Sequence, residues 1–476
     1  MLGSRTRNRA HRLLTSSQRA LQAAQFTKLL ETAASAEAGG ARALATHTLI
    51  IGVHAYRSGV VIRRTSERLG VCALPFVLVL GGLFVHGGDV RGRAALATSL
   101  HAALAPAHST QPPCRGLPPH TAGTDMNEQL HGGGEDKLAT IAWSLRHALR
   151  IVAFTDDLLH AAKAACARFG ISTLTAAPAA APKLLRIPQA VDVSSVDDAR
   201  FARAWPALLA RLRLPPHARI FLLPCGLRPV KAPTLLFDAF TQWCVRVEGG
   251  HDIRLLVVGP ALDADTADAV RRRAHCIRDP LADPTDAAAW DADAPAATSR
   301  IVYCDPVPHG ELLQWTRHAT AVLNTSVSEG QSNALLEAMA LGTLVIARDN
   351  AGNSAIVKDG HTGLLFNKPE EAIAHCALAA RAAALPAVTP SSVAALEGSS
   401  WASSAGSALS EASAHDAGGA ATPTAAAAVG TAAAVRVRRL TDAAREYVHA
   451  AHSAAAEAAA WTQLLHGLAQ EELRAT

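Results

Sequence analysis

Short apolar runs alternate with longer amphipathic stretches along most of the chain. In the first part of the chain the apolar runs are continuous, which is typical of strands that a parallel sheet buries on both faces. The pattern predicts strands over residues 48–53, 75–80, 151–154 and 183–187, and helices over residues 137–149 and 157–169.

The same alternation is clearer after residue 218. It predicts strands over residues 219–225, 253–258, 300–303, 321–324 and 344–347, and helices over residues 232–247, 265–274, 310–318 and 331–341. Strands that alternate with helices of this length form parallel sheets through right-handed crossovers. We therefore expect an α/β protein of two Rossmann-like parallel-sheet domains that face a cleft, with ligands bound beyond the carboxyl ends of the strands.

Two segments show neither the apolar runs expected of strands nor the amphipathic pattern expected of helices. Residues 83–123 are rich in Gly, Ala, His and Pro, and residues 386–434 consist mostly of Ala, Ser, Gly, Thr and Pro. Such compositions bury too little apolar surface to offset the entropy of ordering, so we expect long disordered insertions there. The expected domains are residues 1–188, which carry the first insertion, and residues 189–385. The second insertion and closing helices over residues 435–476 follow.

Composition narrows the protein class. The 476 residues are 49% hydrophobic and 18% charged, and the net charge of +5 comes without a Lys/Arg-rich block, so we expect no nucleic-acid partner. None of the 8 Cys forms a Cys-x-x-Cys pair, which favours buried thiols. Residues 71–85, the longest apolar stretch, fall short of the ~20 residues of a membrane helix. We expect a cytoplasmic protein, with import into an organelle through the Arg-rich residues 1–30 as the alternative.

Two cations follow the strand expected at residues 219–225. Gly226 lets the backbone turn, and Arg228 and Lys231 then extend from the carboxyl end of the strand. A guanidinium can hold two phosphate oxygens, and an ammonium supplies a compact charge. The motif therefore predicts a phosphate-binding loop, with two ordinary surface cations as the alternative.

A pair of carboxylates surrounds the start of the helix expected at residues 331–341. Glu329 precedes that helix and Glu337 lies within it among leucines, where it needs hydrogen-bond donors such as a ribose diol. The free amides and the dipole at the helix start predict an anion site at Gly330, Gln331, Ser332 and Asn333. The alternative is a capping acid and a salt-bridged helix Glu.

These motifs, with Leu336-Glu337-Ala338-Met339-Ala340 and the glycines that punctuate residues 342–363, resemble the glycosyl transferases group 1 family. The resemblance is strong over residues 219–367 and implies the GT-B fold. It also implies retaining, metal-independent transfer from a nucleotide-sugar donor. It assigns Arg228 and Lys231 to the donor diphosphate, Glu329 to the transferred sugar and Glu337 to the ribose. It places phosphate or sugar contacts at the amides of residues 330–333.

Motifs in the first domain extend the resemblance to a eukaryotic branch of the family. They are residues 54–59, Gly81-Gly82, residues 124–128, Phe154-Thr155 and Pro188-Gln189. His54 and Asp125 are candidates for sugar or acceptor contacts, and a structural strand-end histidine is the alternative for His54. In that branch the Gly-Gly and Thr-Asp stretches are contiguous, so residues 83–123 are interpreted as a lineage insertion or a retained intron. The family opens with an apolar strand that residues 1–12 do not supply, which predicts a truncated first domain.

The expected reaction moves a sugar from a nucleoside diphosphate to a hydroxyl acceptor, with no cofactor and no metal. Asp263 and Asp265 are expected to open a helix rather than to form a metal-binding Asp-x-Asp, and Asp291 and Asp293 are not expected to bind metal either. Replacement of Lys231 should impair donor use far more than folding. One alternative is a catalytically inactive binding or scaffold protein of the same fold. Another is a hydrolase that uses both glutamates as an acid/base pair. Its carboxyl groups would need to lie about 5–9.5 Å apart, whereas eight helical residues span about 12 Å, although Glu329 precedes the helix.

Overall fold

The chain forms two compact units. The computed structural model describes residues 50–52, 76–80, 135–173, 183–277, 299–384 and 423–475. The first unit comprises Met1–Val85, Leu117–Ile187 and Gln463–Thr476, and the second comprises His86–Gly116 and Pro188–Thr462.

The described strands of the first unit form a parallel sheet in the order β1-β2-β3-β4. They are β1 (Ile50–Gly52), β2 (Phe76–Leu80), β3 (Arg150–Ala153) and β4 (Leu184–Arg186), with helices α6 (Glu135–His147) and α7 (Asp156–Arg168). Thr155 follows β3 and caps α7, since its hydroxyl accepts a hydrogen bond from the Leu158 amide at 3.2 Å. These elements confirm the strands and helices that the apolar pattern predicts in this region.

The described strands of the second unit form one parallel sheet in the order β11-β10-β9-β5-β6-β8-β7. Its strands are β5 (Arg219–Pro224), β6 (Ile253–Val258), β7 (His275–Ile277), β8 (Ile301–Cys304), β9 (Ala321–Asn324), β10 (Val345–Arg348) and β11 (Leu364–Phe366). In the register of this sheet Leu222 of β5 lies between Leu256 of β6 and Val322 of β9. The predicted α/β class with parallel sheets is confirmed.

Helices cover both faces of this sheet. They are α8 (Ala204–Arg211), α9 (Phe237–Arg246), α10 (Ala264–Arg271), α11 (His309–His318), α12 (Asn333–Leu341), α13 (Ala351–Ser354), α14 (Pro369–Ala383) and α17 (Pro423–Ala451). Short 3₁₀ turns are η1 (Ser194–Asp197), η2 (Ala199–Phe201), η3 (Pro229–Lys231) and η4 (Gly250–Asp252). A last helix, α18 (Ala454–Ala475), carries the boundary between the two units.

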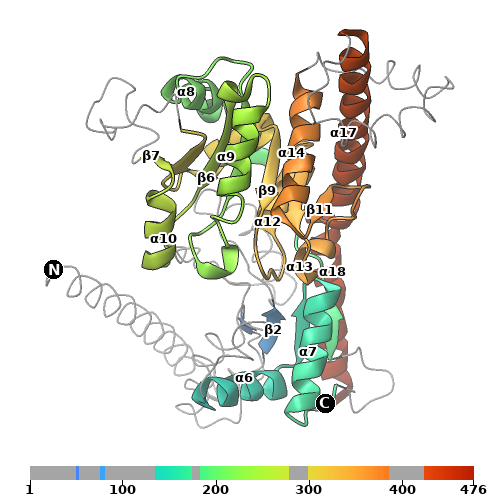
Figure 1. Ribbon diagram of the computed structural model, residues 1–476. Coiled ribbons are helices and arrows are strands. Elements are labelled where there is room, and N and C mark those ends of the chain that lie inside the picture. The colour runs from blue at the N-terminus through green and yellow to red at the C-terminus, as the bar shows by residue number, and fades with distance from the viewer. Residues whose placement is uncertain are drawn as a thin grey trace, which may run out of the picture. The chain divides into compact units, whose positions relative to one another are not determined.

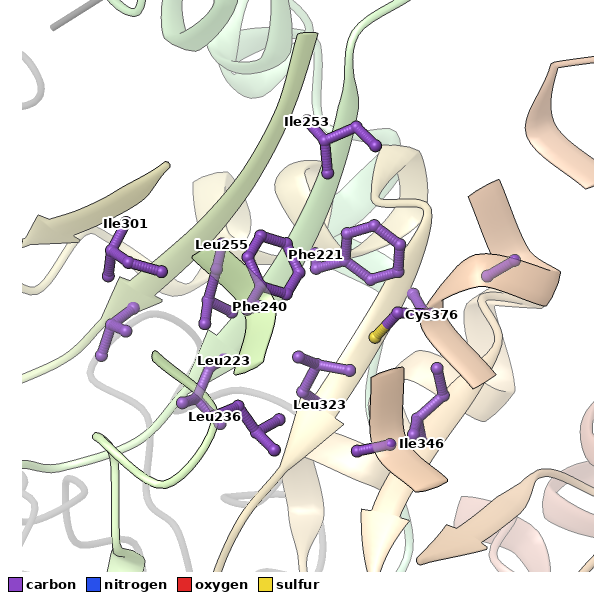
Figure 2. Close-up of a cluster of buried hydrophobic side chains, with 14 of the residues drawn as sticks. Phe221, Leu223, Leu236, Phe240, Ile253, Leu255, Ile301, Leu323, Ile346 and Cys376 are labelled. Atoms are coloured by element: carbon purple, nitrogen blue, oxygen red, sulfur yellow. The ribbon is translucent and has the colours of Figure 1, made fainter. Parts of the chain in front are cut away.

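Successive residues of β5 enter different hydrophobic cores. Phe221 and Leu223 pack with Phe240 of α9 and Cys376 of α14, as Figure 2 shows. Ile220 and Leu222 lie in the other core, with residues of α11 and α12. Because both faces of the strand are buried, its sequence is continuously apolar.

The C-terminal helix α17 begins earlier than the sequence predicts. Residues 423–434 were expected to belong to a disordered insertion, and this expectation is wrong because they form the first turns of α17. Ala has the highest helix propensity, and Ala433 is fully buried in the core that Cys376 of α14 also enters. Figure 1 shows α14 and α17 side by side, so α17 belongs to the second unit.

Other corrections concern element boundaries. The helix expected at residues 232–247 begins at Phe237, and the helix expected at residues 331–341 begins at Asn333. The apolar pattern did not predict α8, α14, β7 or β11. The two missed strands, β7 and β11, are the edges of the sheet, where a few residues suffice to pair with one neighbour.

The described cysteines carry no disulfide. Cys166, Cys244, Cys304 and Cys376 are buried and free, as the sequence predicts, and Cys225 and Cys276 are partly buried and free. No helix within the described ranges is both long and apolar enough to cross a membrane. The compartment stays a prediction, since residues 1–30 lie outside the described residues.

Candidate functional site

The candidate site lies at the carboxyl edge of the large sheet, where β5 and β9 end. After β5 the backbone turns at Gly226, and a Cβ atom there would lie 2.6 Å from Cδ1 of Leu262. Arg228 then precedes the 3₁₀ turn η3, which ends at Lys231. Ala232 follows with a φ of 41°, a left-handed backbone conformation that residues other than glycine rarely adopt. This tight turn brings the Lys231 side chain to the residues that follow β9.

Lys231 forms an ion pair with Glu329. Its Nζ contacts Oε1 of Glu329, and the same oxygen accepts hydrogen bonds from Ser326 Oγ at 2.7 Å and Asn324 Nδ2 at 3.1 Å. The Glu329 side chain is only 8% exposed. Its other oxygen, Oε2, has no hydrogen-bond partner among the described residues and keeps access to solvent. Glu329 is thus held at one oxygen and open at the other.

The pKa of Glu329 lies below the ordinary value for a glutamate. Burial alone would raise this pKa, but the charge of Lys231 and the hydrogen bonds from Lys231, Ser326 and Asn324 outweigh the effect of burial. The carboxylate is therefore ionised at neutral pH. A fixed, ionised and nearly dry carboxylate is suited to accept hydrogen bonds from a ligand.

Asn324, the last residue of β9, organises the surrounding polar groups. Its Nδ2 donates to Glu329 and to Ser332 Oγ at 3.1 Å each, while its Oδ1 accepts from the Ser326 amide at 2.9 Å and from Asn353 Nδ2 at 3.2 Å. The sequence analysis missed Asn324, Ser326 and Asn353. A polar residue at the end of an otherwise apolar strand is the signal that could have indicated Asn324.

Helix α12 begins with uncapped amides. Ser332 occupies the N-cap position, but its side chain makes no capping hydrogen bond and its Oγ accepts from Asn324 instead. The predicted donor residues Gly330 and Gln331 precede the helix, and Asn333 is its first residue. Both polar atoms of the Gln331 amide are buried without a partner among the described residues. The first turn of α12 and Gln331 therefore retain hydrogen-bonding capacity.

Gly352 of α13 allows this helix to lie close to the backbone of Glu329. A Cβ atom on Gly352 would lie 2.2 Å from the carbonyl oxygen of Glu329 and 2.6 Å from its carbonyl carbon. Only glycine permits this distance between the two backbones. The contact helps to fix the position of Glu329. It comes from α13, which follows β10, whereas Lys231 belongs to the turn that follows β5.

Glu337 is bound by a histidine that the sequence analysis did not single out. His309 Nε2 lies 3.0 Å from Glu337 Oε1, and their side chains are 18% and 12% exposed. The expectation that Glu337 is partly buried is confirmed. The protein itself supplies one donor to it, and Oε2 of Glu337 has no partner among the described residues.

The side chain of Arg228 forms no hydrogen bond or ion pair within the described part of the chain, and its Nε is buried. Arg228 precedes the short turn η3 that carries Lys231, and the charges of Arg228, Lys231 and Glu329 all affect the Cys225 thiol. Burial raises the pKa of this thiol to about 12, and Glu329 adds to the rise while Lys231 and Arg228 oppose it. The cluster thus holds one paired and one unpaired cation.

The remaining candidates of the sequence analysis are not part of this cluster. His54 and Asp125, as well as Asp291 and Asp293, lie outside the described residues. Asp263 opens α10 as expected, since its carboxylate accepts a hydrogen bond from the Thr266 amide at 2.9 Å. Over the described ranges, no group of three His, Cys, Asp or Glu side chains is arranged to hold a metal ion.

A family comparison agrees with this geometry. Residues 218–382 match the family model of glycosyl transferases group 1. Over these residues the chain is similar to the glycosyl transferases group 1 family. The matched stretch includes the Arg228, Lys231, Glu329 and Glu337 positions and all seven described strands of the large sheet, β5 to β11. The resemblance stated from the motifs alone is confirmed.

Two curated relatives extend the comparison. The glycosyltransferase 1 domain-containing protein 1 of Xenopus tropicalis is 31% identical over 249 residues, which are 52% of this chain and 61% of the relative. A D-inositol 3-phosphate glycosyltransferase of Nocardia farcinica is 31% identical over 166 residues, 35% of this chain and 33% of the relative. The chain thus matches less than two thirds of the length of each.

Solved structures share the fold. The Anabaena protein HepE in complex with UDP-glucose superposes with a TM-score of 0.50 at 13% identity, covering 90% of this chain and 80% of that one. An α,α-trehalose 6-phosphate synthase from Burkholderia multivorans gives a TM-score of 0.50 at 14% identity, with 91% and 75% covered. The predicted GT-B fold class is confirmed.

Proposed function

We propose that this protein is a glycosyltransferase that moves a sugar from a nucleoside-diphosphate sugar to a hydroxyl-bearing acceptor, with retention of anomeric configuration. The observation that carries the proposal is the cluster of Arg228, Lys231 and Glu329 beside the uncapped start of α12, inside the matched family domain. The similar HepE structure is a complex with UDP-glucose, which supports a nucleotide sugar as the donor class.

The donor diphosphate would occupy the space between the cations and the start of α12. When the anomeric C–O bond breaks, its electron pair goes to the diphosphate and positive charge develops on the sugar ring. Arg228, Lys231 and the first-turn amides of α12 supply fixed positive charge where the negative charge forms. The acceptor oxygen then bonds to the anomeric carbon, and its proton goes to the departing phosphate.

The sugar would lie against Glu329. Oε2 of Glu329, which has no partner among the described residues, can accept hydrogen bonds from sugar hydroxyls. Glu337 would accept from the ribose hydroxyls. We propose no metal and no cofactor for this reaction, because the cations named above already provide charge for a leaving diphosphate.

The hydrolase alternative is disfavoured by the electrostatics of Glu329. A glycosidase needs one carboxylic acid with a raised pKa to protonate the leaving group. The pKa of Glu329 is lowered, and its ion pair with Lys231 opposes protonation. Glu329 is thus poorly suited to act as a general acid.

The first test measures donor binding and turnover. Wild-type protein is mixed with UDP-, GDP- and ADP-sugars, and unfolding is followed by thermal shift. A bound donor at a hundredfold excess over its Kd should stabilise the fold by about 2.7 kcal/mol. Nucleoside diphosphate release, with and without EDTA, then tests transfer and metal independence, and NMR of the product's anomeric proton tests retention. If none of the three donor classes stabilises the protein and none releases nucleoside diphosphate, the proposal is contradicted.

Arg228→Met provides the sharpest variant, because the side chain of Arg228 has no partner within the described residues. We expect unchanged stability and a loss of about a hundredfold in kcat/KM. Arg246→Met on the exposed face of α9 is the matched control and should leave both quantities unchanged. Binding of a donor without turnover in the wild type would instead favour the inactive scaffold alternative.

A further inference from the structure

His309 and Glu337 form a buried polar pair between two helices of the second unit. His309 is the first residue of α11 and Glu337 lies in the middle of α12, two helices that pack against each other. The Nε2–Oε1 distance is 3.0 Å. A carboxylate can only accept a hydrogen bond, so Nε2 of His309 carries the hydrogen and donates it.

The environment of Glu337 makes this hydrogen bond important for its orientation. The residues on either side, Leu336 and Ala338, are fully buried, and Glu337 itself is 12% exposed. His309 is the one partner of Glu337 among the described residues, and it binds Oε1 alone. The remaining oxygen, Oε2, keeps access to solvent. The arrangement repeats that of Glu329, which is also held at Oε1 and open at Oε2.

We infer that His309 is a positioning residue for ribose recognition: it fixes the Glu337 carboxylate so that Oε2 meets a hydroxyl of the donor's ribose. This inference rests on the proposed function. A free glutamate side chain would lose rotamer freedom when the nucleotide binds, and that loss weakens binding. The hydrogen bond from His309 restricts Glu337 before the nucleotide arrives.

The test compares nucleotides with and without ribose hydroxyls. The probes are UDP, GDP and ADP, each beside its 2′,3′-dideoxy form, and Kd is measured by calorimetry. Wild-type protein should bind one of the three more tightly than its dideoxy form. His309→Leu should weaken binding of that ribonucleotide about tenfold, which corresponds to about 1.4 kcal/mol, and leave the dideoxy form unchanged. His309→Gln, whose Nε2 can replace the donor, should restore the preference.

The possible failures differ in what they overturn. If wild-type protein binds none of the three nucleotides, the proposed function falls and the inference with it. If wild-type protein binds a nucleotide but His309→Leu keeps the ribose preference, the inference alone is overturned. Equal weakening of both nucleotide forms, with a lower unfolding midpoint in urea, would show a merely structural role. Failure of His309→Gln to restore the preference would also refute positioning by hydrogen bond.

Discussion

Lys231 and Glu329 depend on each other within the folded chain. The sequence suggests that loss of Lys231 would harm donor use far more than folding, whereas the ion pair with Glu329 leads us to expect a cost to folding as well. Glu329 is 8% exposed, so removal of Lys231 leaves an ionised carboxylate without its counter-charge. Both stability and activity should therefore fall, and stability experiments can separate the two effects.

We expect Lys231→Met to lower the free energy of unfolding at pH 7 by about 3 kcal/mol, the scale for an unpaired buried charge. The double variant Lys231→Met/Glu329→Gln removes both charges and should recover part of this loss without recovering donor turnover. The free energies of unfolding of wild type, Lys231→Met and the double variant are measured by urea unfolding at pH 7. A double variant no more stable than Lys231→Met would show that the ion pair does not account for the loss.

The pH dependence of stability should report the same pair. The pKa of Glu329 is lower in the folded chain than in the unfolded chain, so its ionisation stabilises the fold above the ordinary carboxyl pKa. That contribution is lost as the pH falls through the lowered folded value. The difference in unfolding free energy between wild type and Glu329→Gln should be complete at pH 7 and shrink below about pH 4. A difference that is constant across this range would contradict the lowered pKa.

At the scale of elements, the site depends on how strand ends and short helices meet. Asn324 at the end of β9 binds the Glu329 loop, the start of α12 and Asn353 of α13. Gly352 of α13 allows the closest backbone approach to Glu329. These contacts join segments that follow two different strands, β9 and β10, and no spacing in the sequence reveals them.

Gly352→Ala should distort the site. Its Cβ would lie 2.2 Å from a backbone oxygen, which cannot move as a flexible side chain can. We expect a loss of at least about 1 kcal/mol in stability and weaker donor binding. Gly467→Ala is the matched control, because a Cβ there meets nothing within 4 Å and lies in helix α18. It should be neutral or stabilising by up to about 1 kcal/mol. Similar effects of both substitutions would rule out the close approach as the cause.

At the scale of the whole molecule, the candidate site belongs to one unit. Arg228, Lys231, Glu329, Glu337 and His309 all lie within Pro188–Thr462, as do both hydrophobic cores that flank the large sheet. The donor-binding part of the proposed function therefore needs only this unit. Acceptor contacts at His54 or Asp125 stay predictions, since both residues lie outside the described ranges.

We expect the fragment Pro188–Thr462 to fold alone. It should unfold cooperatively on heating, followed by circular dichroism, and bind the donor nucleotide with nearly the affinity of the full chain. It should not transfer sugar to an acceptor. A fragment that folds but does not bind the nucleotide would show that the first unit contributes to the donor site.

The sequence by itself determined the α/β class and most strands of both sheets, and it singled out the motifs on which the proposed donor site rests. The spacing of apolar residues is a local property of the sequence, so β6 and β9 were predicted with their observed bounds. It did not determine where buried polar groups find their partners. Glu337 was expected to need a donor, but only the packing of α11 on α12 supplies His309. The start of α17 was misassigned for the same reason, since its alanines become core residues only against α14. Contacts between residues distant in the chain depend on three-dimensional packing, which a local pattern does not encode.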